Sequence, residues 1–175
     1  MKTIKLALAV SLALYSAYSQ AEEFRIDRLF VLGDSLSDGG TYTGTATQGL
    51  IGAGVPAGAI PDRLKFTTNS PTAQVWANIV AGKLGIPLDV DVINGVSTTI
   101  NGGNYAQGGS RVSNPIGVAN NPAIGITTIP VTQQVDRLLA DAPTFTRNDL
   151  VALWAGSNDG FIQFATVAAG AITPS

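Results

Sequence analysis

Two apolar runs and two helix-like runs stand out along the chain. Residues 28–33 and 150–155 are almost wholly apolar, the first closing on Gly33 and the second followed by Gly156, as in strands buried on both faces. Apolar residues recur at helical spacing over 70–84 and 130–140. Because strands alternate with helices, the pattern predicts an α/β fold with three α/β/α layers and a mainly parallel sheet.

The two helix-like runs differ in how clearly their ends are marked. Ser70 and Pro71 supply an N-cap and a proline at the first helical position, and Gly-Ile-Pro at 85–87 ends that helix. The second run predicts a buried face, made of Val131, Val135, Leu138 and Leu139.

The remaining segments predict little regular structure. Residues 88–93 alternate as in a short half-buried strand, whereas 39–61 and 94–125 have the composition of loops. Residues 161–171 resemble the start of another helix. Two long strands and one short strand make a small sheet for this fold class, so we expect the domain to be incomplete.

Residues 1–21 have the pattern of a secretory signal peptide. Lys2 and Lys5 precede an apolar run, and Ser19-Gln20-Ala21 closes the segment. The apolar run is about half the ~20 residues of a spanning helix, so a permanent membrane anchor is the weaker interpretation. Cleavage would leave 8 basic against 12 acidic residues, since Lys2 and Lys5 would be lost.

Composition excludes several kinds of site. The 175 residues contain no Cys and no His, which excludes disulfides, cysteine nucleophiles, and most zinc and haem sites. The basic residues are few and scattered, which argues against nucleic-acid binding. The length and the 45% hydrophobic content fit one domain with a substantial core.

Three polar segments contain candidate catalytic residues. Ser35 lies in GDSLS directly after the first predicted strand, Gly108 in NYAQGGS, and Asn158 in GSND after the second long strand. A serine hydroxyl can act as a nucleophile, while a glycine N–H and an asparagine carboxamide can stabilise an oxyanion. Taken singly, each segment is better explained by a turn or a helix cap.

Together the three segments resemble the SGNH subgroup of the GDSL hydrolases. That family is marked by Ser in GDS, Gly in a middle block, Asn in GxND, and Asp and His in a late DxxH block. FVLGDSLSDGG supplies Ser35, NYAQGGSRV supplies Gly108, and LWAGSND supplies Asn158, so the resemblance spans roughly 29–163.

The resemblance implies a flavodoxin-like fold, with 22–175 as the N-terminal portion of the hydrolase domain. It also implies a serine esterase or lipase that works through an acyl-enzyme. The Ser35 N–H, the Gly108 N–H and the Asn158 side chain would hold the oxyanion, while an imidazole takes the Ser35 proton. This chemistry needs no metal or organic cofactor.

The long early loop and the NYAQGG form look most like exported bacterial esterases and lipases, including autotransporter passengers. That likeness implies a secreted protein, or one at the bacterial cell surface or outer membrane. Its substrate would be a small-molecule or lipid ester. An autotransporter would also have an outer-membrane translocator domain as partner.

The chain departs from the family pattern because it contains no histidine, so the late Asp-His block is absent. We therefore expect this chain alone to be inactive and suspect a fragment or a truncated reading frame. Asp34 or Asp38 as a substitute base is disfavoured, because a carboxylate with a pKa near 4 matches this proton transfer poorly. The alternatives are an exported, non-catalytic binding or surface protein on the same frame, and a Gly/Thr-rich adhesin-like β protein.

Overall fold

The structure is a computed structural model. The predicted signal peptide at 1–21 and the predicted cap residues Ser70 and Pro71 lie outside the residues that it describes. Those described are 25–43, 50–59, 74–93, 96–97, 103–118 and 128–170.

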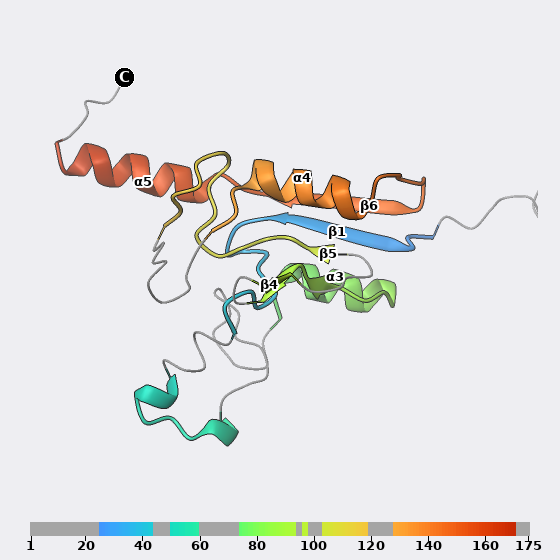
Figure 1. The fold of residues 1–175 in the computed structure, drawn as a ribbon, viewed down its shortest axis with the longest axis horizontal. Helices are drawn as coiled ribbons and strands as arrows, with labels where there is room; N and C mark the ends of the chain where they lie inside the picture. The colour runs from blue at the N-terminus through green and yellow to red at the C-terminus, as the bar shows by residue number, and fades with distance from the viewer. Residues whose placement is uncertain are drawn as a thin grey trace, which may run out of the picture.

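Four parallel strands form the main sheet, in the order β2–β5–β1–β6 (Figure 1). The central strand β1 pairs with β6 along its whole length and with β5 on its other side. The strands are β1 (Arg28–Gly33), β2 (Asp89–Val90), β5 (Gly103–Asn104) and β6 (Asp149–Trp154).

Two helices cover the opposite faces of this sheet (Figure 1). Helix α3 (Trp76–Leu84) lies on one face and α4 (Val131–Asp141) on the other. A further helix, α5 (Ser157–Ala168), follows β6, and a 3-10 turn, η1, spans Ala57–Ala59. The predicted α/β class, with a mainly parallel sheet and helices on both sides, is confirmed.

Alternation along β1 explains how one strand supplies two cores. Leu29 and Val31 pack with the buried residues of α3, whereas Phe30 and Leu32 pack with those of α4. Successive side chains of a strand point to opposite faces, so an unbroken apolar run is buried twice. This is the pattern that 28–33 predicts.

Helix α3 begins later than its cap signal predicts. Its first residue is Trp76, not a residue near Ser70, and Val75 before it is extended (φ −70°, ψ 156°). Val75 is buried in the core with Leu29 and Val31. Val75 therefore packs against β1 from an extended backbone, a contact that a local cap signal does not predict.

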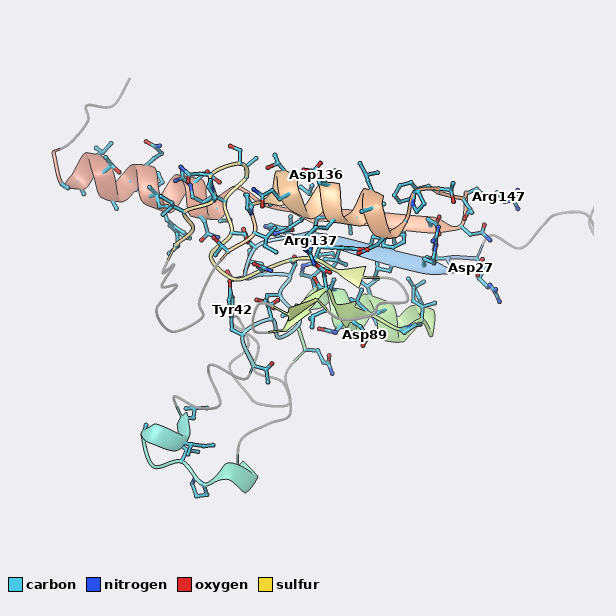
Figure 2. All side chains as sticks on the ribbon, viewed as in Figure 1. Asp27, Tyr42, Asp89, Asp136, Arg137 and Arg147 are labelled. Atoms are coloured by element: carbon cyan, nitrogen blue, oxygen red, sulfur yellow. The ribbon has the colours of Figure 1, made fainter. Side chains whose placement is uncertain are left out.

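The buried face of α4 agrees only in part with the predicted face. Val131 and Leu138 are buried as predicted, but Leu139 is 50% exposed and Gln134 is 1% exposed. Figure 2 shows Asp136 pointing away from the sheet and Arg137 pointing toward it. Arg137 makes two hydrogen bonds to the Asp91 carboxylate, so polar side chains occupy part of the inner face of α4.

The short strand predicted over 88–93 is divided in two. Asp89–Val90 joins the main sheet as β2, while β3 (Val92–Ile93) pairs antiparallel with β4 (Val96–Ser97) in a separate ribbon. The chain leaves the main sheet at Asp91, whose side chain bonds Arg137. The predicted loop 94–125 also contains β5. The sequence does not predict this strand, because a Gly-Asn pair has no strand-like pattern.

The strand β6 begins one residue before the predicted strand 150–155. Few side chains of the described residues pack against it. Its apolar side chains are exposed on both faces, with Leu153 60% and Trp154 54% exposed. Helix α5 begins at Ser157, four residues before the predicted helix start, and leaves Phe161 and Phe164 exposed. The described part of the chain therefore ends in an apolar strand and helix with little packed against them.

Candidate active site

Ser35 lies in the turn that follows β1. The Ser37 N–H donates to the Asp34 carbonyl at 3.1 Å, and the Leu36 N–H donates to Asp34 Oδ1 at 3.1 Å. Asp34 and Ser37 are buried, whereas Ser35 between them is partly exposed. The turn thus places Ser35 at the carboxyl edge of the sheet, where open α/β sheets bind ligands.

Gly33 brings this turn close to the neighbouring strand. Its φ is +151°, and a Cβ built on it would lie 2.1 Å from the Trp154 carbonyl oxygen. The Asp34 N–H donates to that same oxygen at 3.3 Å. Because only glycine permits this approach, the end of β6 fixes the start of the turn that bears Ser35.

Gly108 lies in the loop that leaves β5, beside the Ser35 turn. The preceding Gln107 N–H donates to the Gly33 carbonyl at 3.1 Å. The Gly108 N–H donates to Asp38 Oδ2 at 2.8 Å, and the Gly108 carbonyl accepts from the Tyr42 hydroxyl at 3.1 Å. The Gly108 N–H is therefore already bonded to a carboxylate. The family resemblance predicts this same N–H as a donor to the oxyanion.

Asp38 joins the two loops. Its Oδ1 accepts from the Gly40 and Thr41 N–H groups, each at 2.8 Å, while its Oδ2 accepts from Gly108. Burial raises the pKa of the Asp38 carboxyl, and the hydrogen bonds from Thr41, Gly40 and Gly108 oppose that rise. Both oxygens of Asp38 thus have backbone partners.

Asn158 lies at the start of α5, after β6. Its side chain is 6% exposed, and its Nδ2 donates to the Ser110 carbonyl at 2.7 Å. The next residue, Asp159, accepts from Arg111 Nε at 2.9 Å and from the Val112 N–H at 2.8 Å. The N-terminus of α5 is therefore attached to the same loop that contains Gly108.

The structure brings the three predicted segments to one edge of the sheet. They follow β5, β1 and β6, which are adjacent and parallel, so all three leave the sheet at carboxyl ends. Asp38 connects the Ser35 segment to Gly108, and Asn158 connects α5 to Ser110, two positions after Gly108. Ser35, Gly108 and Asn158 thus belong to one hydrogen-bonded region.

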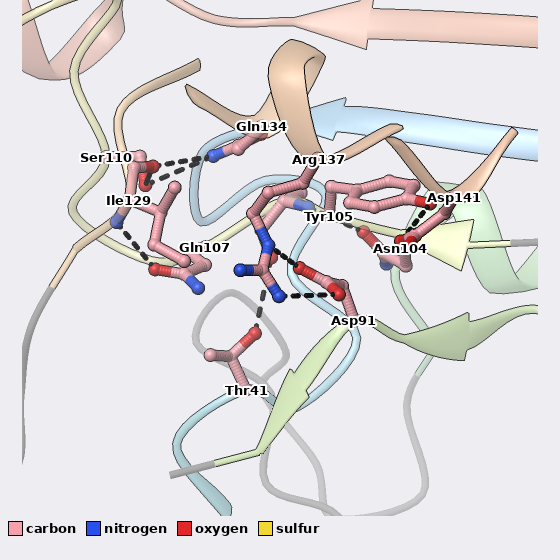
Figure 3. A network of polar contacts seen from close by, with 11 residues as sticks. Thr41, Asp91, Asn104, Tyr105, Gln107, Ser110, Ile129, Gln134, Arg137 and Asp141 are labelled. Carbon is pink, nitrogen blue, oxygen red and sulfur yellow. Dashed lines mark hydrogen bonds and ion pairs between the residues drawn. The ribbon is translucent and has the colours of Figure 1, made fainter. Parts of the chain in front are cut away.

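Gln134 on α4 bonds backbone groups of this region, and the sequence patterns did not predict it as a site residue. Its Oε1 accepts from the Gly33 N–H at 2.8 Å, and its Nε2 donates to the Gly33 carbonyl at 3.0 Å. Figure 3 shows the same carboxamide beside Ser110 and Ile129, whose carbonyl accepts at 2.9 Å. A polar residue among the apolar positions of an amphipathic helix is the signal that could have found it.

Asp34 and Asp38 are the carboxylates closest in sequence to Ser35. Asp34 Oδ2 is buried and has no hydrogen-bond partner among the described residues, and burial raises the pKa of this carboxyl. Asp34 Oδ2 therefore does not hold the Ser35 hydroxyl as a general base would. Asp38 directs its oxygens at backbone N–H groups instead.

No cluster of three or more Asp, Glu, His or Cys side chains suited to a metal occurs in the described ranges. Within the same ranges, no helix has the length and apolar character that a membrane span requires.

Comparison with known proteins identifies the family. The model of the GDSL-like lipase/acylhydrolase family matches residues 29–172, which is most of the chain. The chain belongs to this family. Its class is therefore that of the lipases and acylhydrolases, which hydrolyse esters. The search of the curated proteins found no match.

The family match includes Ser35, Gly108 and Asn158 within its limits. It does not distinguish autotransporter passengers from other members, so that finer likeness stays a prediction. The roles of the three residues likewise stay predictions.

Proposed function

We propose that the chain carries the nucleophile and the oxyanion donors of an exported serine ester hydrolase. The most direct support is that hydrogen bonds join the segments that follow the three adjacent strands β5, β1 and β6. Asp38 joins the segment after β1 to the one after β5, and Asn158 joins the segment after β6 to the one after β5. Ser35 is partly exposed in the turn that follows β1, the middle strand of the three.

In this mechanism Ser35 Oγ attacks the ester carbonyl carbon while its proton passes to a base. The oxyanion that forms accepts hydrogen bonds from the Ser35 N–H, from the Gly108-Gly109 turn and from the Asn158 carboxamide. Asn158 Nδ2 has two hydrogens and donates one to Ser110, so the other is available. Collapse of the intermediate expels the alcohol, and water then hydrolyses the acyl-enzyme.

These 175 residues do not supply an imidazole base, because they contain no histidine. A serine hydroxyl without a base is a weak nucleophile at neutral pH. Loss of one triad member typically leaves only ~10³- to 10⁴-fold catalysis over water. We therefore expect negligible ester turnover from this chain alone at neutral pH.

Covalent labelling at alkaline pH tests the assignment, because hydroxide then replaces the missing base. An alkyl fluorophosphonate is incubated with the protein, and the modified peptide is identified by mass spectrometry. We expect phosphonylation at Ser35 and its loss in Ser35→Ala. Ser113, an exposed serine, provides the matched control, and Ser113→Ala should label like the unmodified protein.

The absence of histidine also favours the second candidate, a non-catalytic exported protein that binds esters on the same frame. Equal, slow labelling of Ser35 and Ser113, together with reversible binding of an ester, would support that candidate. It would contradict the nucleophilic role of Ser35.

A further inference from the structure

We propose, building on the proposed function, that Arg111 and Asp159 are positioning residues. Their ion pair attaches the first turn of α5 to the loop after β5 and thereby directs the Asn158 carboxamide toward Ser35. Neither side chain of the pair touches the substrate in the mechanism above. Both act only through Asn158.

Helix α5 has little packing of its own to fix its direction. All of its residues are described, and of these only Asn158 is buried. Phe161 and Phe164 are 65% and 76% exposed, and Gly156 before the helix has no side chain to cap it. Apolar packing usually stabilises a helix in a protein and contributes little here. Polar contacts of the first turn therefore set the direction of α5.

Two adjacent residues of that first turn bond to one short segment of the loop after β5. Asn158 Nδ2 donates to the Ser110 carbonyl at 2.7 Å. Asp159 Oδ1 accepts from Arg111 Nε at 2.9 Å, and Asp159 Oδ2 accepts from the Val112 N–H at 2.8 Å. Because both carboxylate oxygens of Asp159 are engaged by separate groups, the contact fixes the rotation of the turn as well as its place.

The loop segment is itself held by α4. The Val131 N–H donates to the Arg111 carbonyl, and the Thr132 N–H donates to the Val112 carbonyl, each at 3.0 Å. N–H groups in the first turn of a helix have no acceptor within the helix, so these bonds satisfy them. Val131 is buried in the core with Phe30 of β1. The segment therefore offers α5 an attachment that is tied through α4 to the centre of the sheet.

The ion pair is partly shielded from water. The Arg111 and Asp159 side chains are 14% and 31% exposed, so salt screens the pair less than it screens a surface pair. An Arg–carboxylate hydrogen bond is also directional. Asn158 directly precedes Asp159, and an oxyanion donor must come within about 3 Å of the developing charge. A turn that rotates about α5 would carry the Asn158 carboxamide out of that range.

The first measurement is the rate at which the alkyl fluorophosphonate modifies Ser35 of the full chain at alkaline pH. The phosphoryl oxygen takes the place of the oxyanion, so the rate depends on Asn158. We expect Arg111→Met and Asp159→Asn each to slow labelling roughly 10-fold, less than the ~10²- to 10³-fold cost of losing an oxyanion donor outright. Arg111→Lys, which keeps the positive charge, should recover part of the rate.

A double-mutant cycle separates positioning from a general loss of structure. In an Asn158→Ala background the carboxamide is absent, so Asp159→Asn should slow labelling by less than about 2-fold. Asp149→Asn breaks the ion pair with Arg28 at the other end of β6 and is the matched control. It should have equally little effect in both backgrounds. A full effect of Asp159→Asn in the absence of the Asn158 carboxamide would show a merely structural role and overturn the inference.

NMR of the nitrogen-15-labelled chain decides the inference even if Ser35 is not labelled selectively. Arg111→Met should raise hydrogen exchange of the Asn158 side-chain amide by about 10-fold or more, whereas Asp149→Asn should leave it unchanged. An Asn158 amide that keeps its chemical shifts and its exchange rate in Arg111→Met would overturn the inference. Equal, slow labelling of Ser35 and Ser113, with the expected NMR result, would contradict the proposed function alone.

Discussion

At the scale of single residues, buried polar side chains set the geometry of this site. Asp38, Gln134 and Asn158 are each at most 6% exposed, and each bonds backbone groups in a loop or at the end of β1. Side chains that satisfy backbone groups fix loop conformations which no hydrophobic pattern specifies. The position of Ser35 therefore depends on Asp38 and Gln134, which take no part in the proposed chemistry.

Gln134→Leu should destabilise the protein by about 1–3 kcal/mol, because the Gly33 N–H and carbonyl would lose their partner in a buried environment. Urea denaturation measures the change. The adjacent Gln133, which is exposed on the same helix, is the control, and Gln133→Leu should lie within about 0.5 kcal/mol of the unmodified protein. Equal stabilities of the two variants would remove the structural role of Gln134.

Asp149 should contribute a pH-dependent part of the stability. Two hydrogen bonds of 2.7 Å from Arg28 lower the pKa of its carboxyl from 3.8 to about 2. Since the pKa is lower in the folded protein, this stability is present above about pH 4 and is lost as the pH falls toward 2. Arg28 is partly exposed, so the loss should be of order 1 kcal/mol.

Unfolding by urea at several acidic pH values checks this expectation. The difference in stability between the unmodified protein and Asp149→Asn should shrink as the pH falls through that window. A difference that is the same at every pH would show that the Arg28 pair does not hold the low pKa of Asp149.

At the scale of elements, the strands and helices with long periodic patterns were predictable, and the short ones were not. The run 28–33 matches β1, and 130–140 is one residue offset from α4, because burial of apolar side chains decides both. Strand β5, only Gly103–Asn104, is held by pairing with β1 and β2 on either side. Such pairing has no local signature.

The same contrast holds for the site. The motifs located Ser35, Gly108 and Asn158, and the parallel sheet explains why they lie at one edge. The bonds from Asp38 to Gly108 and from Asn158 to Ser110 join residues 70 and 48 positions apart, so no local pattern could show them.

Strand β6 should promote self-association of the purified protein. It lies at one end of the four-stranded sheet, and Val151 and Leu153 are 46% and 60% exposed on it. An exposed apolar edge strand is a template for pairing with other chains. We expect Leu153→Lys to reduce oligomers seen by light scattering. Ile116→Lys, at a 67% exposed loop position, is the control and should not reduce them.

At the scale of the whole molecule, the family match shows a hydrolase, and the first 21 residues predict export. The exported product should begin at Glu22, because a charged start, an apolar run and Ser19-Gln20-Ala21 occur in the order of a signal peptide. Expression in a bacterial host and intact-mass measurement of the exported protein check this. An exported protein that retains Met1 would contradict it.

We propose that segments following three adjacent strands form one oxyanion site around Ser35. A crystal structure of the phosphonate adduct tests it most directly, because the phosphoryl oxygen occupies the place of the oxyanion. We predict that this oxygen lies within about 3 Å of the Ser35 backbone nitrogen, of a backbone nitrogen in the Gly108-Gly109 turn and of Asn158 Nδ2. A phosphoryl oxygen that points to solvent, with Asn158 directed elsewhere, would contradict the account.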